Sequence, residues 1–200
     1  VQPGRAQRGD AQSVLDYFAG LKIPVEVVKL ERWKDVVSAY EQKSCQVLSG
    51  SLSHLAAARS HLARAPDHVV LPERTRRLAY GPAVRSGDEV WFGAVRWTLF
   101  ALVAAEELGV TSGNVEQMAA SARPDVQRYL SGGRHLSAHL GLEPEWTRRL
   151  VRQLGNYGEL YERHLGAKSP LRLERKANNV ADRGGLLVSP AFDDASLRGS

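Results

Sequence analysis

The chain has 200 residues, of which 43% are hydrophobic and 24% are charged. This is the balance of an ordinary globular protein with one domain or two small ones. No apolar run approaches the roughly 20 residues that a membrane-spanning helix needs. The N-terminus lacks the apolar core of a signal peptide, so the chain is cytosolic or its signal was removed before residue 1.

The formal net charge of the chain is +5. Arginines are interleaved with acidic residues, for example in residues 171–185, and the densest basic clusters do not alternate with aromatic residues. A single-strand nucleic-acid reader would combine the two. The pattern therefore predicts a solvated basic surface and no nucleic-acid partner.

The first 73 residues alternate between helical and strand patterns. Apolar residues at helical spacing predict three helices: 10–23, 32–44 and 51–65. Short apolar or β-branched stretches predict three strands: 24–30, 45–50 and 67–73. Ser51 or Ser53 is the expected N-cap of the third helix. This alternation predicts parallel strands with helices packed on the faces of the sheet.

The pattern changes after Pro72. A strand that ends in a turn is expected over residues 78–88, followed by a long helix over residues 89–109. The dense apolar surface of this helix predicts burial on most sides, with Trp91 and Trp97 as core anchors, and Gly109 fits the C′ position. We place the domain boundary near this change, which divides the chain into residues 1–78 and 79–200.

The remainder of the chain is mostly helical in pattern. We expect short helices within 112–122 and 123–133, and a helical pair within 143–166 that is joined at residues 155–158. Tyr157, Tyr161 and His164 are expected to be packing and helix-surface residues. The tail reads as a loop, a short helix, a turn at "RGG" and a terminal strand, and residues 193–200 are expected to fray.

The sequence offers little for metal or nucleophilic chemistry. Cys45 is the only cysteine, so neither an internal disulfide nor a cysteine-rich zinc site can form. His135 and His139 are four residues apart, but the Glu of an H-E-x-x-H motif is absent and their segment follows "SGG", so it need not be helical. No nucleophile, base and orienting residue occur as a recognisable set. We expect no enzyme activity, no metal and no cofactor.

Four stretches together resemble the periplasmic general L-amino-acid-binding proteins of ABC transporters. They are "HVVLPE" (68–73), "YGPAVRSGDEVWFGAVRWTLFALVAAEELGV" (80–110), "GNYGELYERHLGAKSPLRL" (155–173) and "NNVADRGGLLVSP" (178–190). The resemblance implies a type II periplasmic binding fold, in which two α/β lobes enclose a ligand cleft. It also implies a periplasmic location, an ABC transporter permease as partner, and a small amino acid or related anion as ligand.

The resemblance covers nearly the whole chain but only the C-terminal portion of the family's fold. "VQPG" (1–4) corresponds to the family's "VQSG", the first strand of the second lobe. Residues 1–78 would then be the α/β second lobe, and 79–200 the crossover strand, long helix and helical end of the first lobe. A chain with half of this fold is a fragment, has its other half elsewhere, or is a reduced relative with another use. Apolar surface where the other lobe would pack implies self-association.

The resemblance also nominates ligand-contacting residues: Gly4, Arg5, Ser49 and Ser51. The family's "SGTTT" loop, which receives the ligand carboxylate, becomes "PGRAQRGDAQS" (3–13) here, where Arg5 could still pair with an anion. The family's "CDVYTTD" becomes "CQVLSGS" (45–51), so Ser51 replaces the aspartate that receives the ammonium. This implies a degenerate site. The resemblance implies a partner for the family's cysteine at this position, beside the "VQSG" strand, so Cys45 is either inert core filler or half of a disulfide.

Overall fold

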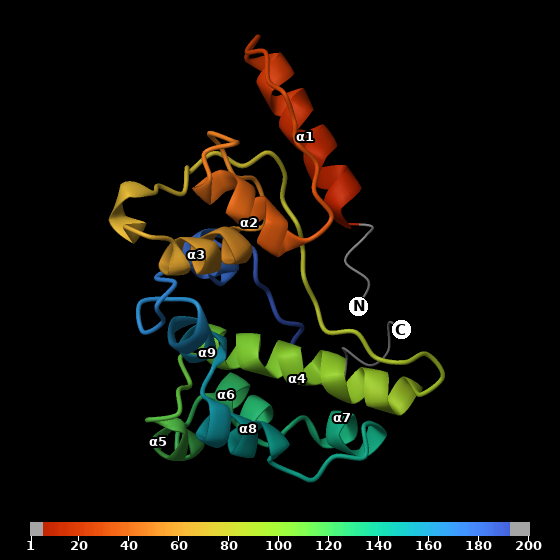
Figure 1. Ribbon diagram of the computed structural model, residues 1–200. Coiled ribbons are helices and arrows are strands. Elements are labelled where there is room, and N and C mark those ends of the chain that lie inside the picture. The colour runs from red at the N-terminus through yellow and green to blue at the C-terminus, as the bar shows by residue number, and fades with distance from the viewer. Residues whose placement is uncertain (1–5, 193–200) are drawn as a thin grey trace. The chain divides into compact units, whose positions relative to one another are not determined.

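The computed structural model describes residues 6–192 and separates the chain into two compact units, Val1–Tyr80 and Gly81–Ser200. Figure 1 labels the helices of each unit. Within the described residues, no helix is both long and apolar enough to cross a membrane. That residues 1–78 and 79–200 are parts of two different lobes remains a prediction.

The first unit contains the three predicted helices. They are α1 (Ala6–Gly20), α2 (Trp33–Glu41) and α3 (Leu52–His61), followed by the short 3-10 helix η1 (Ala65–Asp67). α1 begins earlier than predicted and ends at Gly20, where Lys22 takes a positive φ of 57° and turns the chain. Among the residues of this unit whose burial is described, Ala56, Ala58 and Leu62 are the buried apolar ones. Its core is therefore small and lies along α3.

The strand predictions of the first unit are not confirmed in the described residues. Residues 24–30, 45–50 and 69–73 make no backbone-to-backbone hydrogen bond with any described residue. Several of their apolar side chains are exposed, with Val28, Val47 and Val69 at 53%, 60% and 77%. Val27, Leu48 and Val70 are half-buried. A β-strand is defined by its hydrogen bonds to a neighbouring strand. The predicted first strand of the sheet, residues 1–4, lies outside the described residues.

The second unit is built on α4 (Glu89–Glu107), which confirms the predicted long helix. Asp88 caps its start by accepting a hydrogen bond from the Trp91 N–H at 2.9 Å. Its end is a Schellman motif, because Gly109 has φ +73° and its N–H donates to the Glu106 carbonyl at 3.1 Å, while Val110 N–H donates to Ala105 at 2.7 Å. Gly109 thus occupies the C′ position, as predicted.

The two tryptophans of α4 have different environments. Trp97 is buried at 6% exposure and packs edge-on against Phe192, with ring centroids 5.3 Å apart. Its prediction as a core anchor is confirmed. Trp91 is 56% exposed, so its prediction as a core anchor was wrong. Trp91 lies in the first turn of α4, next to the exposed Phe92.

The remaining helices of the second unit follow α4 in the chain. They are α5 (Val115–Ala119), α6 (Pro124–Leu130), α7 (Arg134–His139), α8 (Trp146–Leu154) and α9 (Tyr157–His164), followed by η2 (Lys176–Asn178) and η3 (Ala181–Arg183). α6, α8 and α9 pack directly on α4. The predicted helical pair and its junction are confirmed. The predicted terminal strand is limited to one parallel bridge between Val180 and Leu187.

Three buried polar side chains of this unit donate to backbone carbonyls. Tyr129 donates its hydroxyl to Ala101 of α4 at 2.9 Å, and Thr147 of α8 donates to the Tyr129 carbonyl. Trp146 donates its indole N–H to Gly132 at 3.1 Å. Burial raises the pKa of the Tyr129 hydroxyl well above its usual value, so this group stays protonated as a donor. These bonds fix α6 and α8 on α4.

Candidate functional site

The predicted ligand loop, residues 49–51, enters α3 through Ser51. The Ser51 hydroxyl oxygen accepts a hydrogen bond from the His54 N–H at 3.3 Å and lies 3.3 Å from the Ser53 hydroxyl. Ser51 is therefore the N-cap, as predicted. Ser49 is exposed and Ser51 is half-buried. The loop presents neutral hydroxyl groups and carries no carboxylate of its own.

Gly50 fixes this loop against α2. A Cβ at Gly50 would lie 2.8 Å from the six-membered ring of Trp33, so the chain has no room there for a side chain. The same Trp33 ring faces the His54 imidazole, with centroids 5.4 Å apart. Trp33 thus contacts both the loop and the first turn of α3. The sequence predicted only that Trp33 lies on the apolar face of a helix, and it did not predict these two contacts.

A second polar contact ties α2 to the segment that follows η1. The Tyr40 hydroxyl lies 2.8 Å from His68 Nδ1, and His68 Nε2 lies 3.3 Å from the Ala63 carbonyl. Both ring nitrogens therefore have partners. Trp33 and Tyr40 make α2 the element that holds two of the three predicted strand segments, at Gly50 and at His68.

Two of the four predicted ligand residues, Gly4 and Arg5, lie outside the described residues. Cys45 is half-buried and is not in a disulfide within the described residues. Its proposed pairing remains a prediction.

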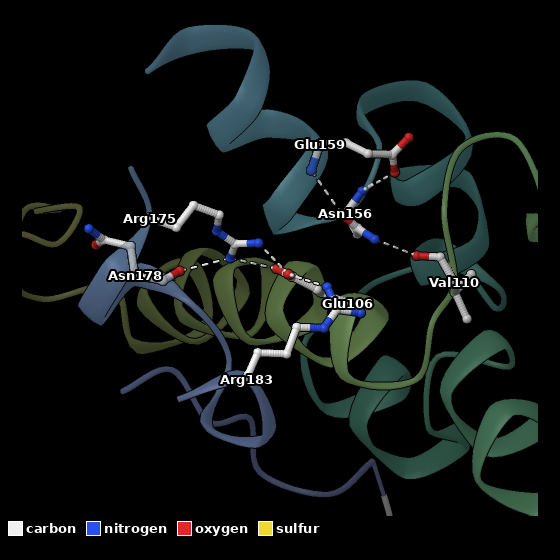
Figure 2. Close-up of polar contacts among 7 residues, drawn as sticks. All are labelled: Glu106, Val110, Asn156, Glu159, Arg175, Asn178 and Arg183. Atoms are coloured by element: carbon white, nitrogen blue, oxygen red, sulfur yellow. Dashed lines mark hydrogen bonds and ion pairs between the residues drawn. The ribbon is translucent and has the colours of Figure 1, made fainter. Parts of the chain in front are cut away.

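The second unit contains a buried charge cluster that sequence reasoning missed. Figure 2 shows the Glu106 carboxylate between the guanidinium groups of Arg175 and Arg183. Arg175 donates from both terminal nitrogens to Glu106, one of them at 2.8 Å, and also donates to the Asn178 carbonyl at 2.7 Å. Arg183 is 3.5 Å away. Glu106 is only 3% exposed, so this pairing offsets the cost of burying its charge.

α9 is shaped to accommodate this cluster. The Arg175 guanidinium lies over the rings of Tyr157 and Tyr161, at 5.7 and 5.6 Å from the ring centroids. A Cβ at Gly158 would come within 2.9 Å of both Arg175 and Glu106, so only glycine fits between the tyrosines. The packing roles predicted for Tyr157 and Tyr161 are confirmed, and His164 lies exposed on α9.

A capping box at the start of α9 borders the same cluster. Asn156 accepts from the Glu159 N–H at 2.9 Å and donates its side-chain amide to the Val110 carbonyl at 2.9 Å, as Figure 2 shows. Glu159 accepts from the N–H groups of Asn156 and Ser112 at 2.9 and 3.0 Å. Burial opposes ionisation of Glu159, but the Ser112 hydroxyl, which donates to the carboxylate at 2.5 Å, and these two N–H groups outweigh it and lower the pKa of Glu159 below the usual value.

A shallow depression lies over this cluster, lined by Glu106, Thr111, Asn156, Lys168, Arg175 and Arg183 among others. Glu106 and Glu159 are occupied by the contacts above, so the cluster is a structural junction between α4, α9 and the tail. One signal could have found it: Glu106 interrupts the apolar run of its helix, and a buried acid requires a cation.

Metal-ligating side chains do not gather in the described part of the chain, where no three of His, Cys, Asp and Glu could hold an ion. His135 and His139 do share a helix, α7, because Gly133 with φ +63° precedes it as its N-cap. The prediction that their segment need not be helical is thus corrected.

The chain is similar to three curated bacterial proteins. It is 36% identical over 180 residues to the general L-amino acid-binding periplasmic protein AapJ of Rhizobium johnstonii, covering 89% of this chain and 53% of that protein. It is 37% identical to the putative amino-acid ABC transporter-binding protein YhdW of Escherichia coli, covering 89% and 52%. It is 34% identical to the glutamate/glutamine/aspartate/asparagine-binding protein BztA of Rhodobacter capsulatus, covering 90% and 54%.

A solved structure shows the same relationship. The ABC transporter periplasmic binding protein from Brucella ovis, with glutathione bound, is 36% identical and superposes with a TM-score of 0.80, covering 90% of this chain and 57% of that one. No family model matches the chain. The chain therefore has part of a periplasmic binding protein fold. It is homologous to the amino-acid-binding periplasmic proteins of ABC transporters, and it spans about half the length of the curated relatives it matches.

Proposed function

We propose that the chain is part of a solute-binding component related to amino-acid ABC transport, with weak or no ordinary amino-acid binding. Its similarity to AapJ, YhdW and BztA supports the class. In this proposal residues 1–78 are the α/β second lobe with a parallel sheet, and 79–200 complete the far side of the first lobe. The protein is periplasmic, is not an enzyme, and acts with an ABC transporter permease.

The chemistry of residue 51 carries the proposal of a divergent site. A buried ammonium group needs an acidic acceptor. Ser51 is neutral, and its oxygen already accepts the His54 N–H at the start of α3. The loss of a charge-assisted hydrogen bond weakens binding by about 1.5–3 kcal/mol, roughly ten- to a hundredfold. The proposed ligand-contacting residues are Gly4, Arg5, Ser49 and Ser51, and the ligand is a small amino acid or related anion.

Calorimetry with a panel of amino acids on the folded chain tests this proposal. We expect weak or no heat with the natural chain, and binding about ten- to a hundredfold tighter for Ser51→Asp. Ser51→Asn is the matched control, because it caps the helix equally well but adds no charge. Tight binding by the natural chain, or equal gains in both variants, would contradict the proposal.

A second candidate function is favoured by the exposed apolar side chains. Val47, Val69 and Leu71 of the first unit are 60%, 77% and 58% exposed. Such surface is unusual for a monomer that works alone. The alternative is a non-transport relative that acts through protein contacts, including self-association. Light scattering that gives a monomer at all concentrations, without a bound protein, would count against it.

A further inference from the structure

The short helix α7 is fixed at both of its ends. Gly133, with φ +63°, precedes its first residue. Its C-terminal end is a Schellman motif, in which Gly141 has φ +63° and donates its N–H to the Ala138 carbonyl at 3.2 Å. In the same motif the Leu142 N–H donates to the Ser137 carbonyl at 2.9 Å. The conformation of α7 therefore does not depend on a ligand.

One face of α7 lies in the core of the second unit, and the other faces solvent. Leu136 and the C-cap Leu140 are 3% and 5% exposed and belong to the hydrophobic core cluster. His135, Ala138 and His139 are exposed. The two buried leucines fix the rotation of the helix, so both histidines stay on its solvent side.

His135 and His139 are one helical turn apart. Residues at i and i+4 are neighbours on a helix surface, with Cβ atoms about 5–6 Å apart. The two zinc-binding histidines of the H-E-x-x-H motif have the same spacing on a helix. The Glu of that motif is the general base and not a metal ligand. Its absence here therefore removes hydrolytic chemistry but leaves the two ligand positions.

A metal ion would occupy one ring nitrogen of each histidine. The other ring nitrogen of a ligating histidine normally donates to a carboxylate, a carbonyl or water. Hydrogen bonding of one nitrogen is therefore compatible with ligation through the other. The charge of Arg134, which precedes His135, opposes a bound cation, but adjacent residues of a helix point in different directions.

We propose that His135 and His139 form a bidentate surface site for a divalent transition-metal ion of the class Cu²⁺, Ni²⁺ and Zn²⁺. Imidazole nitrogen suits these ions, whereas Mg²⁺, Ca²⁺ and Mn²⁺ prefer oxygen ligands. In the described part of the chain no third His, Cys, Asp or Glu completes the group, so water fills the remaining positions. The ion is thus exchangeable, unlike a structural zinc ion with four protein ligands.

This site departs from the expectation of no metal, which treated the segment as one that need not be helical. α7 is helical, and that brings the two histidines onto one face. The inference does not depend on the proposed function, because it requires neither an amino-acid ligand nor any residue of the first unit.

Calorimetric titration of the full, untagged chain with Cu²⁺, Ni²⁺ and Zn²⁺ tests the site. Cys45→Ser is present throughout, because a thiol would compete as a ligand. We expect one ion per chain, with Cu²⁺ bound most tightly, and no binding of Mg²⁺. Ni²⁺ should also slow hydrogen exchange of the α7 amides, because a ligand stabilises the conformation that it binds.

Substitutions of single histidines locate the ion. His135→Gln and His139→Gln should each weaken Cu²⁺ binding by about tenfold or more, since changes even in residues around the ligands cost about 10–100-fold. His164→Gln is the matched control, because His164 is exposed on α9 and has no histidine four residues away. It should leave the affinity unchanged. Circular dichroism of all variants should match that of the natural chain.

A shifted pair separates chelation from the mere presence of two histidines. Arg134→His combined with His139→Gln keeps two histidines in α7 but makes them adjacent, so they no longer share a face. This variant should bind Cu²⁺ as weakly as His139→Gln alone. The proposal is overturned if the shifted pair binds like the natural chain, if His164→Gln causes an equal loss, or if the natural chain binds none of the three ions.

Discussion

Glu106 and Arg175 form a bidentate ion pair across 69 residues of sequence. It joins the last turn of α4 to the segment before η2. Both side chains are nearly excluded from water, at 3% and 11% exposure. A carboxylate in such a place is stable only while the guanidinium remains opposite it. The ion pair therefore holds the segment around Arg175 against the C-terminal end of α4.

The first prediction concerns this ion pair. Arg175→Met should lower the free energy of unfolding by about 3–5 kcal/mol, because the buried Glu106 carboxylate keeps only Arg183, which is 3.5 Å away and 62% exposed. The double variant Glu106→Leu/Arg175→Met should lose clearly less than the sum of the two single variants. Urea denaturation followed by tryptophan fluorescence provides the values. Additive losses would show that the two side chains do not interact.

The second prediction concerns pH. The pKa of Glu159 is lowered because its hydrogen bonds from Ser112 and Asn156 outweigh the opposing effect of burial. A lowered folded-state pKa contributes stability above the unfolded value of about 4.3, and this stability is lost as pH falls through the folded value.

Glu159→Gln should therefore be less stable than the natural chain near pH 7, and the gap should narrow as the pH falls below about 4.3. Thermal melts between neutral and acidic pH measure this difference. Glu174→Gln is the control, because the Glu174 side chain is 79% exposed and should change little at any pH. A gap that is constant with pH would contradict the role of the Glu159 carboxylate.

The third prediction concerns Gly50. Gly50→Ala should destabilise the first unit by about 1–3 kcal/mol, because its Cβ would lie 2.8 Å from the Trp33 ring. Trp33→Leu in the same chain should relieve most of this added cost. Gly20→Ala is the matched control, since nothing lies within 4 Å of a Cβ there. Hydrogen exchange of the α3 amides reports on this unit separately, and equal effects of the two alanines would rule out the contact.

The fourth prediction concerns the start of α3. Ser51→Ala should cost about 1 kcal/mol by removing the hydrogen bond that the His54 N–H donates, whereas Ser51→Asp and Ser51→Asn should retain it. Circular dichroism during urea unfolding compares the three variants. If alanine proves harmless while both polar residues destabilise the chain, Ser51 does not act as the N-cap in solution.

The sequence by itself determined most of the helices and several of their ends, although it misplaced the bounds of α1 and did not predict α7. Periodic apolar residues define α2, α3 and α4, and the local chemistry of Ser51, Asp88 and Gly109 sets where they begin or end. Helical periodicity and helix caps depend on residues within one or two turns of each other, so they can be predicted from the sequence alone. The similarity to amino-acid-binding proteins could also be recognised from the sequence, because the matching residues form long continuous stretches that extend over most of the chain.

Only the tertiary structure decided which side chains meet. Trp91 and Trp97 lie on one helix, yet Trp91 is exposed, whereas Trp97 is buried against Phe192 from the far end of the chain. The contact between Trp33 and Gly50 and the ion pair between Glu106 and Arg175 join segments that no local pattern connects. The predicted strands illustrate the same limit, because a ladder requires a neighbouring strand, whereas a helix closes its hydrogen bonds within its own segment.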